Sequence, residues 1–273
     1  MHMKQATILA SLGILASIAF ASAADAGGSI NAGQLFVGSD LTYPPYDYLD
    51  SSNRPAGLDV ELTTALAKAA GLKIKFVDTR FENLIIGVSS GQFDVIASAL
   101  YVKPERTKQT DFVPYMKSGV SIAVLKGSGF AFQTLEDLCG HSFGSVKGSA
   151  WLQRVDEINR TTCADRKIDA REFPTAPEAA QALLSGGIDA QVEDSAVLAE
   201  AVRKLNGRII ITNREQLYPV IVALGLKKGN TELADILTRA MSAIKANGEY
   251  QALLAKYNVA APTEDEFRAA AGL

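Results

Sequence analysis

Strand and helix patterns alternate along most of the chain, in two successive series. The first series has apolar strand patterns at residues 35–39, 73–77 and 94–99, with helix patterns at 57–71 and 82–90 between them. In the helix at 57–71, apolar side chains share one face, acidic residues lie in the first turn and a glycine ends the helix. This order of strands and helices predicts an α/β unit with a mainly parallel sheet.

A second series begins near residue 119. Its predicted strands lie at residues 120–125, 142–146, 168–173, 188–192 and 208–211, and its predicted helices at 150–160, 175–185 and 195–205. Each unit is long enough to bury a core of its own. The sequence therefore predicts two α/β units in series.

The last part of the chain has no sheet of its own. Residues 220–226 form a strand pattern, and helices are predicted at 231–247 and 249–257. We expect these elements to pack back on the first unit, so that the chain crosses between the units near residues 116–119 and 217–222. Two crossings form a hinge, and the cleft between the units is the expected site.

The first residues have the pattern of a secretory signal peptide, which we assign to residues 1–23. Lys4 is the only early charge, an apolar run covers residues 6–20, and Ala21-Ser22-Ala23 fits a cleavage site. A membrane anchor is the alternative, but the run is shorter than the ~20 residues that span a bilayer. We therefore predict a periplasmic protein. Its predicted lobe I comprises residues 24–117 and 222–273, the latter including a C-terminal helix, and its lobe II comprises residues 118–221.

Charge and cysteine content narrow the classes of partner. The chain has 27 Lys+Arg against 30 Asp+Glu, a net charge of −3, which gives no reason to expect nucleic acid. Cys139 and Cys163 are an even pair in an oxidising compartment, so we predict a disulfide. No CxxC occurs, and His141 is the only histidine outside the signal peptide. We predict no metal site and no cofactor, and a monomer.

Residues 94–112 combine a buried strand, a polar turn and a helix that begins at Pro104 and carries Arg106. Open α/β sheets bind ligands where the carboxyl end of a strand meets the start of a helix. A guanidinium fixed there is a forked, permanently charged partner for a carboxylate. From this stretch alone, the alternative is a solvated helix arginine.

The resemblance of the chain to a known family rests on four stretches. They read VGSDLTYPPYDY, GLDVELTTALAKAAG, FDVIASALYVKPERTKQTDFVPY and KKGNTELADILTRAMSAIKANGEYQALLAKY. The mature chain resembles the periplasmic solute-binding proteins of amino-acid ABC transporters, family 3 of the bacterial extracellular solute-binding proteins. The resemblance implies the type II fold, in which two α/β lobes joined by a two-crossing hinge enclose the ligand cleft. It also implies hinge closure around an amino acid or amino-acid-like zwitterion, and delivery to the membrane permease subunits of an ABC importer.

The same resemblance implies a set of ligand contacts. Arg106 matches the arginine that binds the ligand α-carboxylate, and Asp194 matches the acid that accepts from its α-ammonium group. Burying a zwitterion requires one fixed cation and one fixed anion, which agrees with this pair. The other implied ligand contacts are Ser98, Tyr101, Ser149, Asp40, Tyr43 and Phe81.

Departures from the family pattern leave the solute open. Tyr101 stands where a small hydroxyl residue is usual, so its ring either enlarges an aromatic wall or points away. Asp194 is alternatively a helix N-cap. The rival functions are binding of an opine, ectoine-like or quaternary amine solute, and a cyclohexadienyl dehydratase-type enzyme that uses Glu193, Asp194 or Lys147. We expect a binding protein with no catalytic residue.

Overall fold

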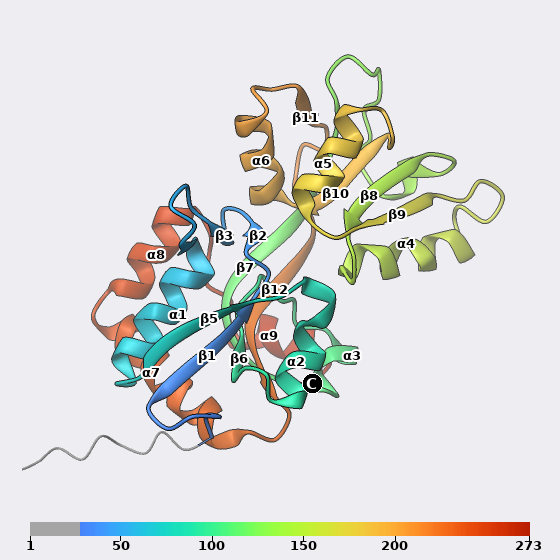
Figure 1. Cartoon of the computed structure of the whole chain (residues 1–273). Coiled ribbons are helices and arrows are strands. Elements are labelled where there is room, and N and C mark those ends of the chain that lie inside the picture. The colour runs from blue at the N-terminus through green and yellow to red at the C-terminus, as the bar shows by residue number, and fades with distance from the viewer. Residues whose placement is uncertain (1–27) are drawn as a thin grey trace, which may run out of the picture.

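Figure 1 shows the protein as a computed structural model, which describes residues 28–273. Two α/β lobes lie side by side, and one pair of long strands, β7 (Thr110–Leu125) and β12 (Leu217–Lys227), runs between them. The prediction of an α/β fold with two lobes and a two-crossing hinge is confirmed. The predicted signal peptide at 1–23 lies outside the described residues.

The hinge strands β7 and β12 pair antiparallel from Thr110 opposite Lys227 to Val120 opposite Leu217. Through them, the strands of both lobes form one sheet of nine strands in the described part of the chain, in the order β5-β1-β6-β12-β7-β10-β8-β9, with β11 paired to β7. The strand predicted at 120–125 is therefore only the last six residues of a 16-residue strand. Pro114 and Gly119 weaken the strand pattern within it.

Lobe I holds the parallel strands β1 (Gln34–Ser39), β5 (Lys73–Asp78) and β6 (Val95–Ile96), and a small sheet of β2 (Thr42–Tyr43), β3 (Asp47–Leu49) and β4 (Pro55–Ala56). Its helices are α1 (Leu58–Ala69), η1 (Phe81–Asn83), α2 (Leu84–Ser90), α3 (Pro104–Thr107), α7 (Thr231–Ala246), α8 (Glu249–Tyr257) and α9 (Glu264–Ala271). Leu58, Leu62 and Leu66 of α1 are buried in the core, as the periodicity predicted.

Lobe II holds the parallel strands β8 (Ser142–Val146), β9 (Asp169–Phe173) and β10 (Ala190–Asp194), together with β11 (Ile209–Ile211). Its helices are η2 (Glu136–Leu138), α4 (Ala150–Arg160), α5 (Ala176–Leu184) and α6 (Ser195–Lys204). All five residues of β10 are buried, including Glu193 and Asp194. The strand therefore carries two carboxylates into the interior.

One local prediction was wrong. The strand predicted at 94–99 is a strand only at Val95–Ile96, because Ala99 has a φ of 44° and its N–H bonds the buried Asp59 carboxylate at 2.7 Å. After Asp40, the short strands β2 and β3 form a hairpin, and Pro44 and Pro45 lie in the turn between them.

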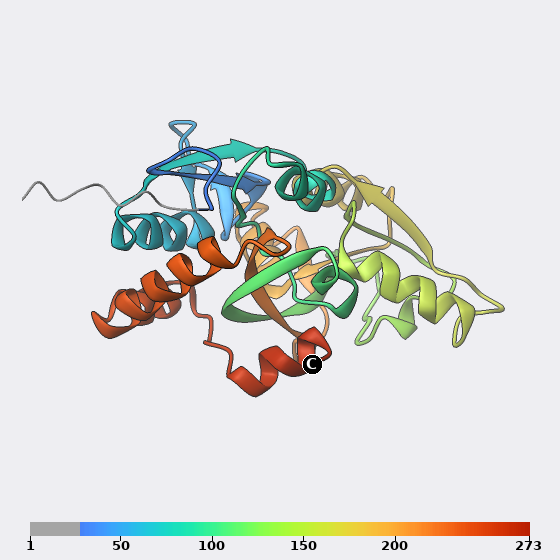
Figure 2. The same ribbon diagram turned by 90° about the horizontal axis from the view of Figure 1, so that it is seen from below.

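The C-terminal helix α9 packs on the hinge strand β12 and on α3, below the sheet in Figure 2. Ala271 joins a buried cluster with Val102, Ile221 and Ala223. A capping box between Thr263 and Glu266 begins the helix. The last helix therefore packs against the second hinge strand, β12.

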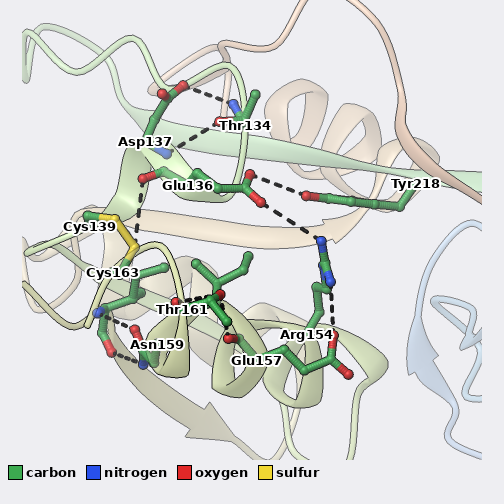
Figure 3. The surroundings of a disulfide bond; sticks show 12 residues. Thr134, Glu136, Asp137, Cys139, Arg154, Glu157, Asn159, Thr161, Cys163 and Tyr218 are labelled. Atoms are coloured by element: carbon green, nitrogen blue, oxygen red, sulfur yellow. Dashed lines mark hydrogen bonds and ion pairs between the residues drawn. A yellow bond between two sulfur atoms is a disulfide. The ribbon is translucent and has the colours of Figure 1, made fainter.

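A disulfide joins Cys139, at the end of η2, to Cys163 after α4, as predicted (Figure 3). Nearby, the Glu136 carboxylate accepts a hydrogen bond from the Tyr218 hydroxyl of β12 at 3.4 Å and lies 3.9 Å from the Arg154 guanidinium. These contacts tie α4 and the disulfide loop to the start of the second hinge strand.

Removing the disulfide should lower the free energy of unfolding by about 3 kcal/mol, because the bond closes a loop of about 25 residues in the unfolded chain. The check is urea unfolding of a Cys139→Ala, Cys163→Ala variant beside the oxidised and reduced parent. The reduced parent should unfold at a lower urea concentration, close to the variant, while reductant leaves the variant unchanged. Equal midpoints for oxidised and reduced parent would contradict the prediction.

Candidate binding site between the lobes

A cavity lies between the lobes and is lined from both sides. Lobe I supplies Asp40, Tyr43, Phe81, Ser98, Ala99 and Tyr101, and lobe II supplies Val146, Ser149, Ala150, Trp151 and Glu193. Six of the eight predicted contact residues are in this lining; Arg106 and Asp194 are not. The free volume is about 30 Å³, room for no more than a few water molecules. A larger solute therefore enters only when the lobes separate.

The cavity lies where parallel strands end. Asp40 follows β1, Ser98 follows β6, Ser149 follows β8, and Glu193 is the next-to-last residue of β10. Parallel strands bring their carboxyl ends to one edge of a sheet, so residues far apart in sequence meet there. The hinge strands then bring the two edges together across the cleft.

Arg106, on α3, lies in a neighbouring groove that shares Phe81 with the cavity. Its guanidinium donates to the backbone oxygens of Tyr101 at 3.1 Å and of Gly148, in lobe II, at 3.4 Å, and lies 5.6 Å from the centre of the Phe81 ring. Within residues 28–273 it forms no ion pair. Burial lowers the pKa of Arg106 to about 10, so the group stays charged at neutral pH.

Asp194 ends β10 behind the cavity wall. One carboxylate oxygen accepts from the Ser118 hydroxyl at 2.8 Å, and the other lies 3.5 Å from the Tyr43 hydroxyl. Asp194 stands at the N-cap position of α6, but its side chain makes no capping hydrogen bond. Burial, and next the charge of Asp59, raise the pKa of Asp194 well above its usual range.

Glu193 reaches the cavity, whereas the sequence suggested it only as an acid for an enzyme. Its Oε1 accepts from the Ser145 hydroxyl at 3.1 Å and the Val146 N–H at 2.8 Å, and its Oε2 accepts from the Tyr43 hydroxyl at 2.8 Å. Burial raises the pKa of Glu193 from 4.5 to about 7, although these hydrogen bonds act in the opposite direction. In the described part of the chain, neither Glu193 nor Asp194 pairs with a cation.

Asp40 differs from these two acids because it has a cationic partner. Arg80 lies 2.7 Å from Asp40 Oδ1, and the Thr42 hydroxyl and the Phe81 N–H donate to the same carboxylate. Burial still raises the pKa of Asp40, against the lowering effect of these contacts. The charge of Asp40 is thus compensated within lobe I.

The predicted serines already have protein partners. Ser98 donates to the buried carboxylate of Asp47 and accepts from the Asp40 N–H at 3.0 Å. Ser149 lies 3.1 Å from the Ser145 hydroxyl and occupies the N-cap position of α4. Both serines still line the cavity, so a ligand can replace these protein partners as the hydrogen-bonding partner of either hydroxyl.

Aromatic rings form much of the wall. The Tyr101 ring meets Trp151 of lobe II edge to face, with centroids 5.5 Å apart, and Trp151 lies 6.1 Å from Tyr218. Of the two orientations considered for Tyr101, the structure has the ring in the cavity wall. Tyr46 is fully buried outside the cavity, with its hydroxyl 3.3 Å from that of Ser118.

Polar contacts outside the cavity also hold the lobes together. Lys147 of lobe II pairs with Glu82 of lobe I at 2.9 Å, and Lys103 of lobe I donates to Gln153 of lobe II at 2.9 Å. With the Tyr43–Glu193 hydrogen bond, these contacts define a closed arrangement of the lobes. All three join side chains only, so they can break without disturbing either lobe.

Residues 28–273 hold no cluster of three or more His, Cys, Asp or Glu side chains suited to a metal ion. In the same part of the chain, none of the helices is long and apolar enough to span a membrane.

Residues 35–260 match the sequence model of the bacterial extracellular solute-binding proteins, family 3. The L-cystine-binding protein TcyJ of Escherichia coli (strain K12) is 28% identical over 229 residues, 82% of each chain. The structure of an ancestral arginine-binding protein bound to arginine superposes with a TM-score of 0.77 at 32% identity, covering 82% of this chain and 98% of that one. An ancestral amino acid-binding protein, a precursor of cyclohexadienyl dehydratase, gives 0.72 at 30% identity, covering 82% and 95%.

The raised pKa of Glu193 predicts a pH-dependent stability. The folded chain holds this proton more tightly than the unfolded chain, so the stabilising contribution is complete below pH 4.5 and is lost as the pH rises through about 7. Glu193→Gln removes this dependence. Relative to the parent, the variant should gain roughly 3 kcal/mol in free energy of unfolding between pH 4.5 and 8.

Urea unfolding of both proteins at several pH values checks this prediction. Asp59, whose pKa burial raises to about 6, contributes equally to both proteins and cancels in the difference. A difference that is the same at pH 4.5 and pH 8 would show that Glu193 titrates normally in the folded chain.

Proposed function

This chain belongs to family 3 of the bacterial extracellular solute-binding proteins, and we propose that it captures a free amino acid, or a similar zwitterion, between its lobes. The bound solute is then delivered to the permease subunits of an ABC importer. We place the protein in the periplasm, as a monomer without catalytic activity. The relatives described above are named for binding cystine, arginine or amino acids generally, which supports a binding role.

The observation that carries this proposal is a set of ionisable side chains at the cleft without an oppositely charged partner among residues 28–273: the partly buried Arg106 and the buried Asp194 and Glu193. Arg106 donates only to backbone oxygens, and Asp194 and Glu193 accept only from neutral donors in the described part of the chain. Burying a charge without an opposite charge is costly. A zwitterion brings a carboxylate for Arg106 and an ammonium group for Asp194, so its binding compensates both sides.

The two charges come from different lobes, which couples binding to closure. Arg106 is on α3 of lobe I, whereas Asp194 ends a strand of lobe II. A solute can satisfy both only when the lobes are close together, so it shifts the equilibrium toward the closed arrangement. In the closed state without solute, the Tyr43 and Ser118 hydroxyls occupy the Asp194 region, and the solute replaces part of these contacts.

A thermal-shift screen of the mature protein tests the proposed ligand class. Amino acids, opines, ectoine and betaines are each added, and a ligand at 100 times its dissociation constant should add about 2.7 kcal/mol of stability. We expect an amino acid to give the largest shift, with no turnover of prephenate. The proposal fails if no zwitterion shifts the melting temperature, or if prephenate is consumed.

Arg106→Ala should weaken binding of the identified solute by roughly 2–5 kcal/mol, because the solute carboxylate is left buried without its partner. Arg106→Lys should restore only part of the affinity, since an ammonium group lacks the guanidinium fork. Isothermal titration calorimetry gives the affinities. Arg171→Ala is the matched control, because Arg171 also donates to a backbone oxygen but lies on the exposed side of lobe II. Equal affinities for Arg106→Ala and the parent would contradict the assigned role.

A further inference from the structure

Under the proposed function, the acidic side chains at the cleft outnumber the positive charges available to balance them once an α-amino acid with a neutral side chain is bound. The solute carboxylate neutralises Arg106, its ammonium group neutralises Asp194, and Arg80 already neutralises Asp40 at 2.7 Å. Glu193 then remains as the one cavity-lining acid, among the described residues, without an opposite charge. A zwitterion with a neutral side chain leaves this imbalance in place.

Glu193 also has unused hydrogen-bonding capacity on its cavity side. Its Oε1 accepts two hydrogen bonds, from Ser145 and Val146, whereas its Oε2 accepts one, from Tyr43. A carboxylate oxygen has two lone pairs, so Oε2 can accept one further donor. Only 1% of Glu193 is accessible to solvent in this arrangement, so a further donor reaches it only from a solute around which the lobes have opened and closed.

The walls around Glu193 suit a cation. Phe81, Tyr101 and Trp151 line the same cavity, and aromatic faces attract ammonium and guanidinium groups. An acidic side chain would instead bring a second carboxylate beside Glu193, and like charges in a buried site repel strongly. The charge of Glu193, its free hydrogen-bonding capacity and the aromatic walls thus all favour a bound amino acid with a cationic side chain.

We propose that Glu193 is a specificity-determining residue, which makes this protein prefer amino acids with a cationic side chain to neutral or acidic ones. This inference rests on the proposed function, because it assumes that Arg106 and Asp194 bind the α-groups. Lobe II, through Glu193, then selects the side chain of the solute, because Asp40 in lobe I already pairs with Arg80.

The test uses pairs of amino acids that differ in charge but little in shape: L-arginine with L-citrulline, and L-lysine with L-norleucine, with L-glutamate as the acidic member. Affinities are measured by calorimetry at pH 8, where Glu193 is mostly ionised. The mature parent should bind at least one cationic member about tenfold or more tightly than its neutral partner, the range for a hydrogen bond to a charged group. L-Glutamate should bind most weakly.

Glu193→Gln keeps the size of the side chain and removes its charge, so it should reduce the cationic preference to within about threefold while neutral amino acids still bind. The matched control is Glu82→Gln, which removes one negative charge at the cleft rim, where Glu82 pairs with Lys147. The control should change the affinities of cationic and neutral members by the same factor. Circular dichroism confirms that each variant is folded, and the parent measurements stand even if Glu193→Gln does not fold.

The inference is overturned if a neutral or acidic amino acid binds the parent more tightly than every cationic one. It is also overturned if folded Glu193→Gln keeps the full preference, or if Glu82→Gln loses it to the same extent. Binding of neutral amino acids alone would leave the proposed function standing and remove only the role of Glu193. Binding of no zwitterion at all would remove both.

Discussion

The pairing of β7 with β12 is the constraint on which the rest of the structure depends. Both lobes are built outward from these two strands, so their relative position is set by how the pair bends. The register shifts between Leu217 and Val220 and again between Val222 and Ala223, and such irregularities let a strand bend without losing its sheet. Away from the hinge, the lobes meet at side chains that can part, so opening leaves each core intact.

This arrangement places ionisable side chains without an oppositely charged partner, among the residues that the structure describes, on the two sides of the cleft. Arg106 in one lobe and Asp194 in the other are held by neutral hydrogen-bonding groups. Such groups lower the cost of burial but do not replace an opposite charge. Under the proposed function, a bound zwitterion supplies the missing opposite charges, and the free energy gained in this way shifts the two lobes toward the closed arrangement.

The fold is shared with proteins named for different solutes at about 30% identity, so the architecture does not define the ligand. In this chain the Tyr101 ring contacts Trp151 across the cleft, and Asp40 forms an ion pair with Arg80. Glu193 lines the cavity from lobe II. These few positions change the chemistry of the cavity and leave the hinge unchanged.

The sequence by itself determined most helices and the alternation of strands and helices along the chain, because periodicity and capping are local signals, as in α1 with its buried Leu62 and Leu66. It also determined the disulfide, from an even cysteine pair in a chain with a predicted signal peptide. Six of the contact residues that it predicted line one cavity. Only the tertiary structure decided that β7 continues through both lobes, and that Glu193 rather than Asp194 reaches the cavity. A strand buried on both faces carries no alternation in its sequence, so the direction of each carboxylate depends on neighbours such as Val146 and Ser118, which are distant along the chain.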